Sequence, residues 1–195
     1  MKWYKYDIKN LSYDEYSKWY SLMSEKKQRR VDSFRFETDK KLTVVGDMLA
    51  RKAISDLCSV SFDSIVLKTG EHGKPYVEDL SVHFNISHSG DMVVCAVDDK
   101  PVGIDIESIR KVNLRVAKRV CTNEELVSVF GDIPEKDDFY DVSDPDVLKR
   151  FFELWTAKEA CAKCSGIGIA GIKAAVDMSR VERFCFDDYI VSIYR

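Results

Sequence analysis

Long apolar runs and an excess of one charge are both missing from this sequence of 195 residues. Its longest apolar segments are far shorter than the roughly 20 residues that cross a bilayer, so we expect no membrane span. Its net charge is −3, so the composition gives no reason to expect a nucleic acid or an anionic membrane as a partner. Its first residues have no apolar signal core, and we therefore expect a cytoplasmic protein.

Histidine is scarce, and neither histidine nor cysteine is arranged for a metal centre. The three histidines, His72, His83 and His88, lack the helical spacing of a zinc site. Cys161 and Cys164 form a C-x-x-C inside a predicted helix, with no second pair for zinc and no βαβ pattern after it. We therefore expect the six cysteines to be reduced thiols that pack as small hydrophobic side chains.

Hydrophobic residues make up 45% of the chain and charged residues 32%, which is typical of a globular protein with a sizeable core. Short apolar or alternating stretches predict strands at residues 4–8, 65–68, 82–88, 92–97, 103–108, 174–178, 181–186 and 189–194. Capping residues predict helices after Ser12, Ser24, Asn113, Thr122 and Asp144. Apolar residues at core spacing from Leu42 to Leu57 predict a further long helix. We expect residues 131–146 to form an exposed loop. The expected class is α+β.

A weak internal echo suggests two similar halves. Residues 90–97 resemble residues 187–194, and each stretch follows a helix and some strands. The chain is long enough for two small halves, which we expect at 1–102 and 103–195.

Two short motifs carry the chemistry, and the first lies at residues 103–107. It is a predicted strand with Asp105 and Glu107 two positions apart. Side chains two apart on a strand share one face, while Ile104 and Ile106 fill the other face. Both carboxylates are therefore expected to point the same way.

The second motif is a predicted helix with Trp155, Glu159 and Lys163 on one side, at i, i+4 and i+8. If Glu159 joins the two acids of the strand, three carboxylates repel one another unless a cation is present. They offer only oxygen ligands, which suit Mg²⁺, with Mn²⁺ as an alternative. Lys158 and Lys163 flank Glu159 and can contact phosphate.

A basic cluster near the start has two interpretations. Lys26, Lys27, Arg29 and Arg30 begin one predicted helix, and a solvated charged face is the simpler reading. The alternative is an anion site, with Thr43 and Gly46 near it if the two helices pack together. Each motif alone is also more often structural: strands often end in acids, and Glu159–Lys163 is an ordinary helical pair.

Taken in order, the motifs resemble those of one family, the 4′-phosphopantetheinyl transferases of the surfactin-synthetase type. Residues 102–107 are similar to its Gly-Ile/Val-Asp-x-Glu strand, and residues 155–163 to its Trp-Ser/Thr-x-Lys-Glu-Ala/Ser-x-x-Lys helix. Residues 73–76 and 84–90 are similar to an upstream block of the family. The resemblance runs from about residue 24 to residue 168.

The resemblance implies a fold and an activity. The fold is a pseudo-two-fold pair of similar α/β halves with the active site in the cleft between them, and larger members are monomers. The activity is Mg²⁺-dependent transfer of the 4′-phosphopantetheine arm of coenzyme A to a serine of an apo acyl or peptidyl carrier protein. Adenosine 3′,5′-bisphosphate is the other product.

The motif match also implies roles for single residues. Asp105, Glu107 and Glu159 would hold the metal against the pyrophosphate of coenzyme A. Glu159, directly or through a metal-bound water, would take the proton of the carrier serine, with Asp105 and Lys163 as its catalytic companions. The residues that would contact coenzyme A are Lys27, Arg30, Thr43, Lys74, Pro75, Ser87, His88, Lys158 and Lys163, with Ser89 as a further hydroxyl.

Two of these groups have a more specific implied position. His88 would bind the 3′-phosphate with help from Lys27 and Arg30, whereas Lys74 and Pro75 would line the adenine pocket. Arg30 departs from the family pattern, which has lysine there, and the four neighbouring cations leave the register of this basic pair open.

Carrier proteins are usually acidic, which suggests a docking surface. Arg115, Lys118 and Arg119 lie beside the acidic strand in sequence and could meet a negatively charged partner. Phe130 or Leu126 would be the apolar anchor.

Two other functions stay open at this stage. One is a Mg²⁺-dependent, nuclease-like phosphoesterase that uses the Asp-x-Glu strand, but it does not account for residues 155–163. The other is a non-catalytic coenzyme A-binding module, which would have less need of three clustered acids.

Overall fold

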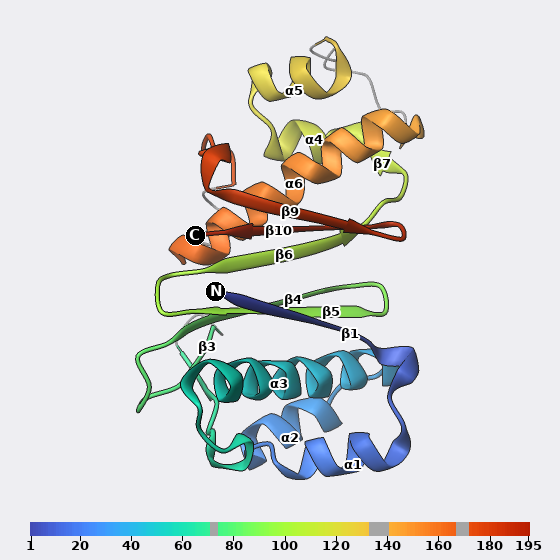
Figure 1. Cartoon of the computed structure of the whole chain (residues 1–195). Helices are drawn as coiled ribbons and strands as arrows, with labels where there is room; N and C mark the ends of the chain where they lie inside the picture. The colour runs from blue at the N-terminus through green and yellow to red at the C-terminus, as the bar shows by residue number, and fades with distance from the viewer. Residues whose placement is uncertain (71–73, 133–140, 167–171) are drawn as a thin grey trace.

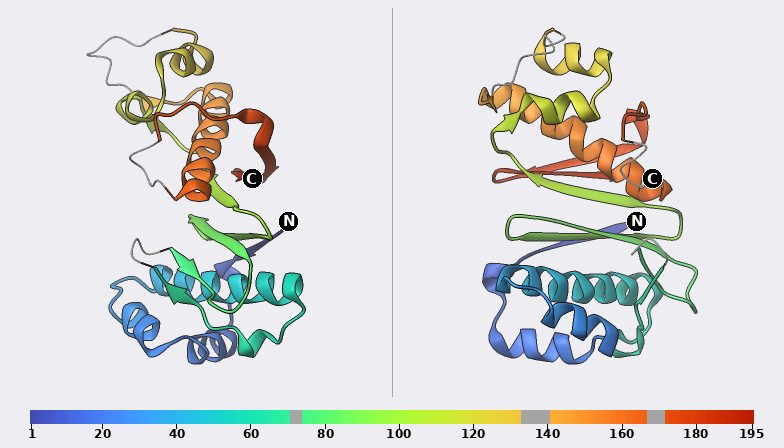
Figure 2. Two further views of the ribbon diagram at one scale, coloured as in Figure 1. Left: turned by 90° about the vertical axis from the view of Figure 1, so that its left-hand side faces the viewer. Right: turned by 180° about the vertical axis from the view of Figure 1, so that it is seen from behind.

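The computed structural model describes residues 1–70, 74–132, 141–166 and 172–195, so His72 and the end of the family resemblance at residue 168 lie outside it. It has two halves, each with a three-stranded antiparallel sheet and its helices on one side (Figure 1). The two sheets are adjacent in the middle of the molecule, and the helices form the two outer layers (Figure 2). The predicted α+β class is confirmed.

The first half places one long helix on its sheet. Its elements are β1 (Lys2–Asp7), α1 (Tyr13–Ser21), α2 (Glu25–Asp32), α3 (Glu37–Cys58), β2 (Lys68–Thr69), β3 (Pro75–Tyr76), β4 (His83–Ser89) and β5 (Met92–Asp98), with 3₁₀ turns at Ile8–Asn10 and Phe62–Ser64. The strand order of the sheet is β1-β5-β4, and β2 pairs with β3 separately. Val45, Leu49 and Ala53 of α3 are buried in one cluster with Val93 and Cys95 of β5.

The second half repeats this plan, again with one long helix and two shorter ones among the described residues. Its elements are β6 (Gly103–Ser108), β7 (Val112–Asn113), α4 (Leu114–Val120), α5 (Asn123–Phe130), β8 (Asp141–Val142), α6 (Pro145–Ser165), β9 (Val181–Phe186) and β10 (Tyr189–Tyr194), with a 3₁₀ turn at Met178–Arg180. The strand order is β6-β10-β9, and α6 packs on β6 and β10. Among the described residues, no helix is both long and apolar enough to cross a membrane.

The two sheets have the same connectivity. In each, the first strand of the half and the second-last strand flank the last one, β5 or β10. These central strands contain the similar stretches at residues 90–97 and 187–194, and each follows a turn with a left-handed residue, Gly90 (φ 54) or Asp187 (φ 49). The internal echo therefore falls on equivalent strands, while a two-fold relation between the halves stays a prediction.

Most predicted helix starts are confirmed by their caps. Ser12 with Glu15 and Thr122 with Glu125 form capping boxes, which satisfy backbone N–H groups in the first turns of α1 and α5. Asp144 caps α6 ahead of a proline in its first turn. Asn113 caps α4, whereas Ser24 precedes α2 without a side-chain cap hydrogen bond among the described residues.

Three strand or loop predictions are wrong in part. Of the predicted strand at 65–68 only Lys68 is in β2, because Ile65 and Leu67 are buried under α3 rather than paired in a sheet. Residues 174–178 are not a strand; the carbonyl of Ala174 instead accepts a hydrogen bond from Lys158 Nζ. The predicted loop at 131–146 contains β8, with residues 133–140 outside the described part.

Gly103 marks the point where α6 approaches β6 most closely. A Cβ at this position would lie 1.9 Å from the carbonyl oxygen of Ala160 and 2.5 Å from the backbone nitrogen of Cys164. Only glycine tolerates such an approach, because both neighbours are backbone atoms. The glycine of the first motif thus lets the helix of the second motif lie directly on its strand.

The two halves meet along a polar seam between β4 and β6. Asn85, Ser87 and Ser89 alternate along β4, so their side chains share one face. Ser87 Oγ donates a hydrogen bond to Asp105 and Ser89 Oγ donates one to Glu107. Both acids of β6 are therefore held by hydroxyl groups from the other half.

Candidate active site

A pocket of about 290 Å³ lies between the two halves. Its lining residues are Ile86, Ser87 and His88 of β4, Asp105, Ile106 and Glu107 of β6, and Trp155, Glu159 and Lys163 of α6. Three elements bring the two sequence motifs and the upstream block to one place. The pocket lies where the active site was expected, between the halves, and its catalytic role stays a prediction.

Asp105 is 4% exposed and is bound through only one of its oxygens. Oδ1 accepts hydrogen bonds from Lys163 Nζ at 2.6 Å and from Ser87 Oγ at 2.7 Å. Oδ2 is buried and has no hydrogen-bond partner among the described residues. Burial raises the pKa of Asp105 from 3.8 to about 6, against the lowering effect of Lys163 and Ser87.

Glu107 lies two residues further along β6 and is bound in a similar way. Its Oε2 accepts hydrogen bonds from Ser89 Oγ at 2.8 Å and from Nη1 of Arg110 at 2.7 Å. Each acid of the strand thus has one serine from β4 and one cation as partners.

Glu159 and His88 complete the charged lining of the pocket. Burial raises the pKa of Glu159, Lys163 opposes the rise, and the nearby Glu107 adds to it. The pKa of His88 is lowered by burial and then by the charge of Lys163, so its imidazole is neutral at pH 7. Glu159 is thereby brought closer to the range of an effective general base.

The donor set fits a hard divalent cation. Asp105 Oδ2 is a buried carboxylate oxygen without a partner among the described residues, and the charge of Glu159 raises the pKa of Asp105. Added positive charge would relieve both effects, and carboxylate oxygens are the ligands that Mg²⁺ prefers. The three acids are not tightly grouped in this structure. In the described part of the chain, no three His, Cys, Asp or Glu side chains lie close enough together to hold a metal ion.

A second pocket, of about 250 Å³, adjoins the first and is lined in part by the basic helix α2. Its lining residues are Met23, Lys26, Lys27, Arg30, Leu42, Thr43, Gly46, Asp47, Thr69, Pro75, Ile86 and His88. The two pockets share Ile86 and His88, so they lie next to each other. The predicted packing of α2 on α3 is confirmed, since Thr43 and Gly46 lie beside the cations.

The structure also narrows the register of the basic cluster. Lys26, Lys27 and Arg30 line the second pocket, whereas Arg29 pairs with Glu25 where both side chains are largely exposed. Lys27 Nζ lies 2.5 Å from Oδ2 of Asp47, which is itself buried. Lys27 is therefore already paired, and Arg30 is the better placed of the two predicted residues for an incoming anion.

Known proteins with similar sequences point to one family. Residues 10–100 match the sequence model described as "4′-phosphopantetheinyl transferase, N-terminal", and residues 101–188 match that of the 4′-phosphopantetheinyl transferase superfamily. The 4′-phosphopantetheinyl transferase psf-1 of Bacillus pumilus is 38% identical over 150 residues, 76% of this chain and 60% of that protein. The 4′-phosphopantetheinyl transferase Sfp of Bacillus subtilis is 35% identical over 161 residues, 82% of this chain and 67% of that protein.

The chain belongs to the 4′-phosphopantetheinyl transferase superfamily. A more distant relative, the L-aminoadipate-semialdehyde dehydrogenase-phosphopantetheinyl transferase of Xenopus laevis, is 31% identical over 163 residues. The chain spans 60% of the length of the Bacillus pumilus relative and 67% of the Bacillus subtilis one. The two matched regions meet near residue 101, close to the predicted boundary between residues 102 and 103, which stays a prediction.

Lys158 is part of the superfamily motif but does not line the first pocket. Lys158 is 1% exposed, and its Nζ bonds both carboxylate oxygens of Glu125 at 2.7 and 2.8 Å and the carbonyl of Ala174 at 3.1 Å. Its neighbour Glu159 faces the other way, because consecutive side chains diverge around a helix. The prediction that Lys158 contacts pyrophosphate is therefore wrong for this structure.

Lys74 lies outside both pockets. Its Nζ donates a hydrogen bond to the backbone oxygen of Lys163 at 3.1 Å, and it lines a separate hollow that also includes Pro75. Pro75 also lines the second pocket, and its place near the base of the nucleotide stays a prediction. Lys74 is thus better described as a link between the halves.

Several partners of the site residues were not predicted from the sequence. Asp47 and Arg51 form a buried ion pair in α3, with Nε 2.6 Å from Oδ1, and Arg51 also binds the carbonyls of Ile65 and Leu22. Two opposite charges four residues apart in a largely apolar helix are the sequence signal for such a pair. Arg110 lies three residues after Glu107, and this spacing of opposite charges is the sequence signal for their pairing.

The predicted docking face needs one correction. Arg115 and Arg119 are exposed on α4, but Leu126 is 4% exposed and so is a core residue rather than an apolar anchor. The exposed apolar side chains in this region are Val116 on α4 and Val127 on α5. Leu126 packs inward because it shares the buried face of α5 with Val129.

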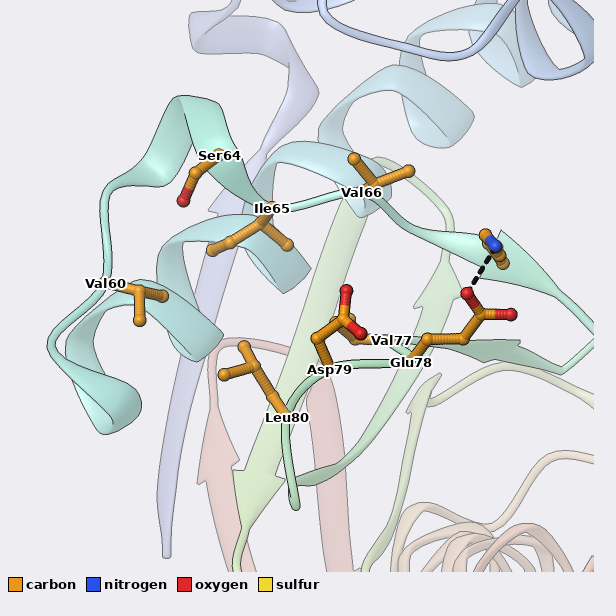
Figure 3. A pocket seen from close by; sticks show the side chains of 9 residues that line it. Val60, Ser64, Ile65, Val66, Val77, Glu78, Asp79 and Leu80 are labelled. Carbon is orange, nitrogen blue, oxygen red and sulfur yellow. Dashed lines mark hydrogen bonds and ion pairs between the residues drawn. The ribbon is translucent and has the colours of Figure 1, made fainter.

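A further hollow, of about 370 Å³, lies apart from the predicted site (Figure 3). Val60, Ile65 and Leu80 point into it, and Lys68 and Glu78 form an ion pair at one end. None of the predicted catalytic, metal or coenzyme A residues lines it.

Proposed function

We propose that this protein transfers the 4′-phosphopantetheine arm of coenzyme A to a serine of an apo acyl or peptidyl carrier protein. The observation that carries the proposal is the junction of two pockets, one with three carboxylates and Lys163, the other with a basic helix. A polyphosphate nucleotide needs both, because its pyrophosphate and its 3′-phosphate are separate anionic groups. The superfamily membership gives the same reaction.

In this proposal the metal is held by Asp105, Glu107 and Glu159. Bound there, Mg²⁺ would neutralise the pyrophosphate of coenzyme A and so ease departure of the leaving group. Mn²⁺ is the alternative ion. Lys163 would contact the same pyrophosphate as a point charge, since its ammonium already lies 2.6 Å from Asp105.

The reaction replaces the phosphoanhydride bond of coenzyme A with a phosphodiester bond to the carrier serine. The serine oxygen of the carrier forms a bond to the β-phosphorus of coenzyme A, and the bond from that phosphorus to adenosine 3′,5′-bisphosphate breaks. Glu159 takes the serine proton, as the motif match implies. Lys163 stabilises the negative charge on the leaving bisphosphate.

The second pocket would hold the nucleotide part of coenzyme A. Arg30 is placed to pair with the 3′-phosphate, and Lys27 contributes charge that Asp47 partly offsets. His88 lies in both pockets and would donate a hydrogen bond from its neutral ring. Thr43 and Pro75 complete the lining, and Ser87 acts mainly by holding Asp105 and Lys163.

We further propose that the carrier docks on α4 and α5. The exposed cations Arg115 and Arg119, with Lys118 between them, suit an acidic partner, and Val116 and Val127 add exposed apolar contact. A monomeric state stays a prediction of the family resemblance, and a cytoplasmic location stays a prediction of the sequence.

One experiment tests the activity directly. The protein is incubated with coenzyme A, Mg²⁺ and several apo carrier proteins, and each carrier is then weighed by mass spectrometry. The mass should rise by one phosphopantetheine, and the rise should vanish in EDTA and in the Glu159→Gln variant. Carriers of unchanged mass across the whole set would reject the proposal.

A further inference from the structure

Arg110 is the cation bound to the second acid of β6. Its Nη1 donates hydrogen bonds to Glu107 Oε2 at 2.7 Å and to the carbonyl of Ser108 at 3.0 Å. Its guanidinium carbon lies 5.2 Å from the centre of the Phe152 ring, and Phe152 is buried. These contacts keep the positive charge of Arg110 beside Glu107, where a metal ligand is proposed.

The two cation–acid pairs of the site differ in exposure. The side chains of Arg110 and Glu107 are 55% and 18% exposed, whereas those of Lys163 and Asp105 are 29% and 6% exposed. Water reaches the arginine of the first pair more readily than either partner of the second, so the Arg110–Glu107 pair opens at less cost than the Lys163–Asp105 pair. The pair of Lys163 with Asp105 is less exposed and also includes Ser87, so it is the more persistent of the two.

A divalent cation and Arg110 compete for Glu107. The guanidinium binds the same oxygen that Ser89 binds, and a second cation on this carboxylate would lie close to the first. Like charges at such a distance repel, so the metal binds more weakly while Arg110 keeps its place. Displacing the guanidinium removes that repulsion and leaves Ser89 to orient the carboxylate.

We propose that Arg110 is the exchangeable counter-ion of Glu107. It neutralises the carboxylate while no metal is bound, and it must release Oε2 before a divalent cation binds there. This role rests on the metal site of the proposed function. Arg110 is then a positioning residue, which sets the metal concentration at which the site fills without touching the reacting atoms.

The test measures metal binding rather than turnover. Mn²⁺ is titrated into the full chain at saturating coenzyme A, and free Mn²⁺ is followed by electron paramagnetic resonance against a protein-free blank. Arg110→Ala should lower the Kd for Mn²⁺ by about three-fold to five-fold, a modest gain that matches an exposed pair. Arg110→Lys should fall between wild type and Arg110→Ala.

Two controls make the result specific. Lys111→Ala removes the same charge from the next, exposed residue and should leave the Kd unchanged. In a Glu107→Gln background, Arg110→Ala should have no effect on the Kd, because the competition is for that carboxylate. Thermal unfolding without metal checks that each variant is folded.

Two results would contradict the proposed role of Arg110. An unchanged or higher Kd in folded Arg110→Ala would overturn the counter-ion role and leave the proposed function intact. No Mn²⁺ binding by the wild-type protein would overturn the metal site of the proposed function and this inference with it.

Discussion

The ammonium of Lys163 lies 2.6 Å from Oδ1 of Asp105, while Oδ2 of the same carboxylate is buried without a hydrogen-bond partner among the described residues. One oxygen of the acid is thus neutralised by the protein and the other is left for a further cation. This arrangement costs stability when no metal is present, because a buried carboxylate is poorly solvated.

Asp105 makes the metal-free protein less stable as pH rises from about 4 to about 6. Its pKa is raised from 3.8 to about 6 in the folded state, so the folded chain binds the proton more tightly than the unfolded chain does. Stability from this group is fully present below the unfolded pKa and is lost as pH rises through the folded pKa. Asp105→Asn should therefore stabilise the protein at pH 7.5 by about 1–3 kcal/mol while it abolishes transfer.

The measurement is urea denaturation in EDTA between pH 4 and pH 8. The difference in unfolding free energy between Asp105→Asn and wild type should be near zero at the acidic end and level off above the folded pKa. The difference isolates Asp105 from all other titrating groups. A gap that does not change with pH would show that Asp105 is not the cause.

Gly103→Ala should destabilise the fold by at least about 3 kcal/mol. The new Cβ would lie 1.9 Å from a carbonyl oxygen of α6, and backbone cannot move aside as a side chain can. Gly46→Ala, in the interior of α3, is the matched control, because its Cβ would meet side-chain carbons, of Ile86 at 3.3 Å and of Val93 at 3.9 Å, rather than backbone. It should change stability by no more than about 1 kcal/mol, since alanine favours a helix.

Chemical denaturation of both glycine variants checks this prediction. A Gly103→Ala variant as stable as wild type would mean that α6 does not lie on β6 as closely as described. In that case the second motif would not be held against Asp105 by direct contact.

Changing Lys158 or Lys163 to methionine should have different effects, the first on stability and the second on coenzyme A binding. Lys158→Met leaves Glu125 without its buried cation, and it should cost about 2–4 kcal/mol of stability with no change in the Kd for coenzyme A. Lys163→Met should weaken coenzyme A binding at least about ten-fold, because a phosphate loses a direct cation. Calorimetric titration with coenzyme A, alongside denaturation, gives both quantities.

A second change tests the reason for the loss in Lys158→Met. Adding Glu125→Gln should recover part of the stability, since the unpaired carboxylate is then removed. If Lys158→Met instead weakened coenzyme A binding as much as Lys163→Met, Lys158 would belong to the phosphate site after all.

The sequence predicted the elements of the site well because their signals are local. Asp144 with Pro145, and Thr122 with Glu125, define helix starts through contacts within a few residues. The alternation around Asp105 likewise predicts a strand with two acids on one face. Such patterns need no knowledge of the rest of the fold.

Contacts between distant segments could not be predicted in this way, because no local sequence pattern specifies them. Lys158 belongs to a motif whose neighbours Glu159 and Lys163 line the pocket, yet its partner Glu125 lies 33 residues away on α5. Ser87 and Ser89 meet the acids of β6 only because the edge strands β4 and β6 face each other across the two halves. Burial of Leu126 rather than Val127 depends on which face of α5 packs inward, which a helix of eight residues does not fix by itself.

Reversal of Arg115 and Arg119 to glutamate should raise KM for the carrier protein about ten-fold or more and leave the Kd for coenzyme A unchanged. Both side chains are exposed on α4, outside the two pockets that would bind the nucleotide. Lys18 and Lys100 are exposed cations of the first half, and their reversal gives the same change in net charge as a control. Initial rates at several carrier concentrations, with coenzyme A saturating, should show the rise in KM only for the α4 pair, and an equal rise in both variants would point to net charge rather than to a docking surface.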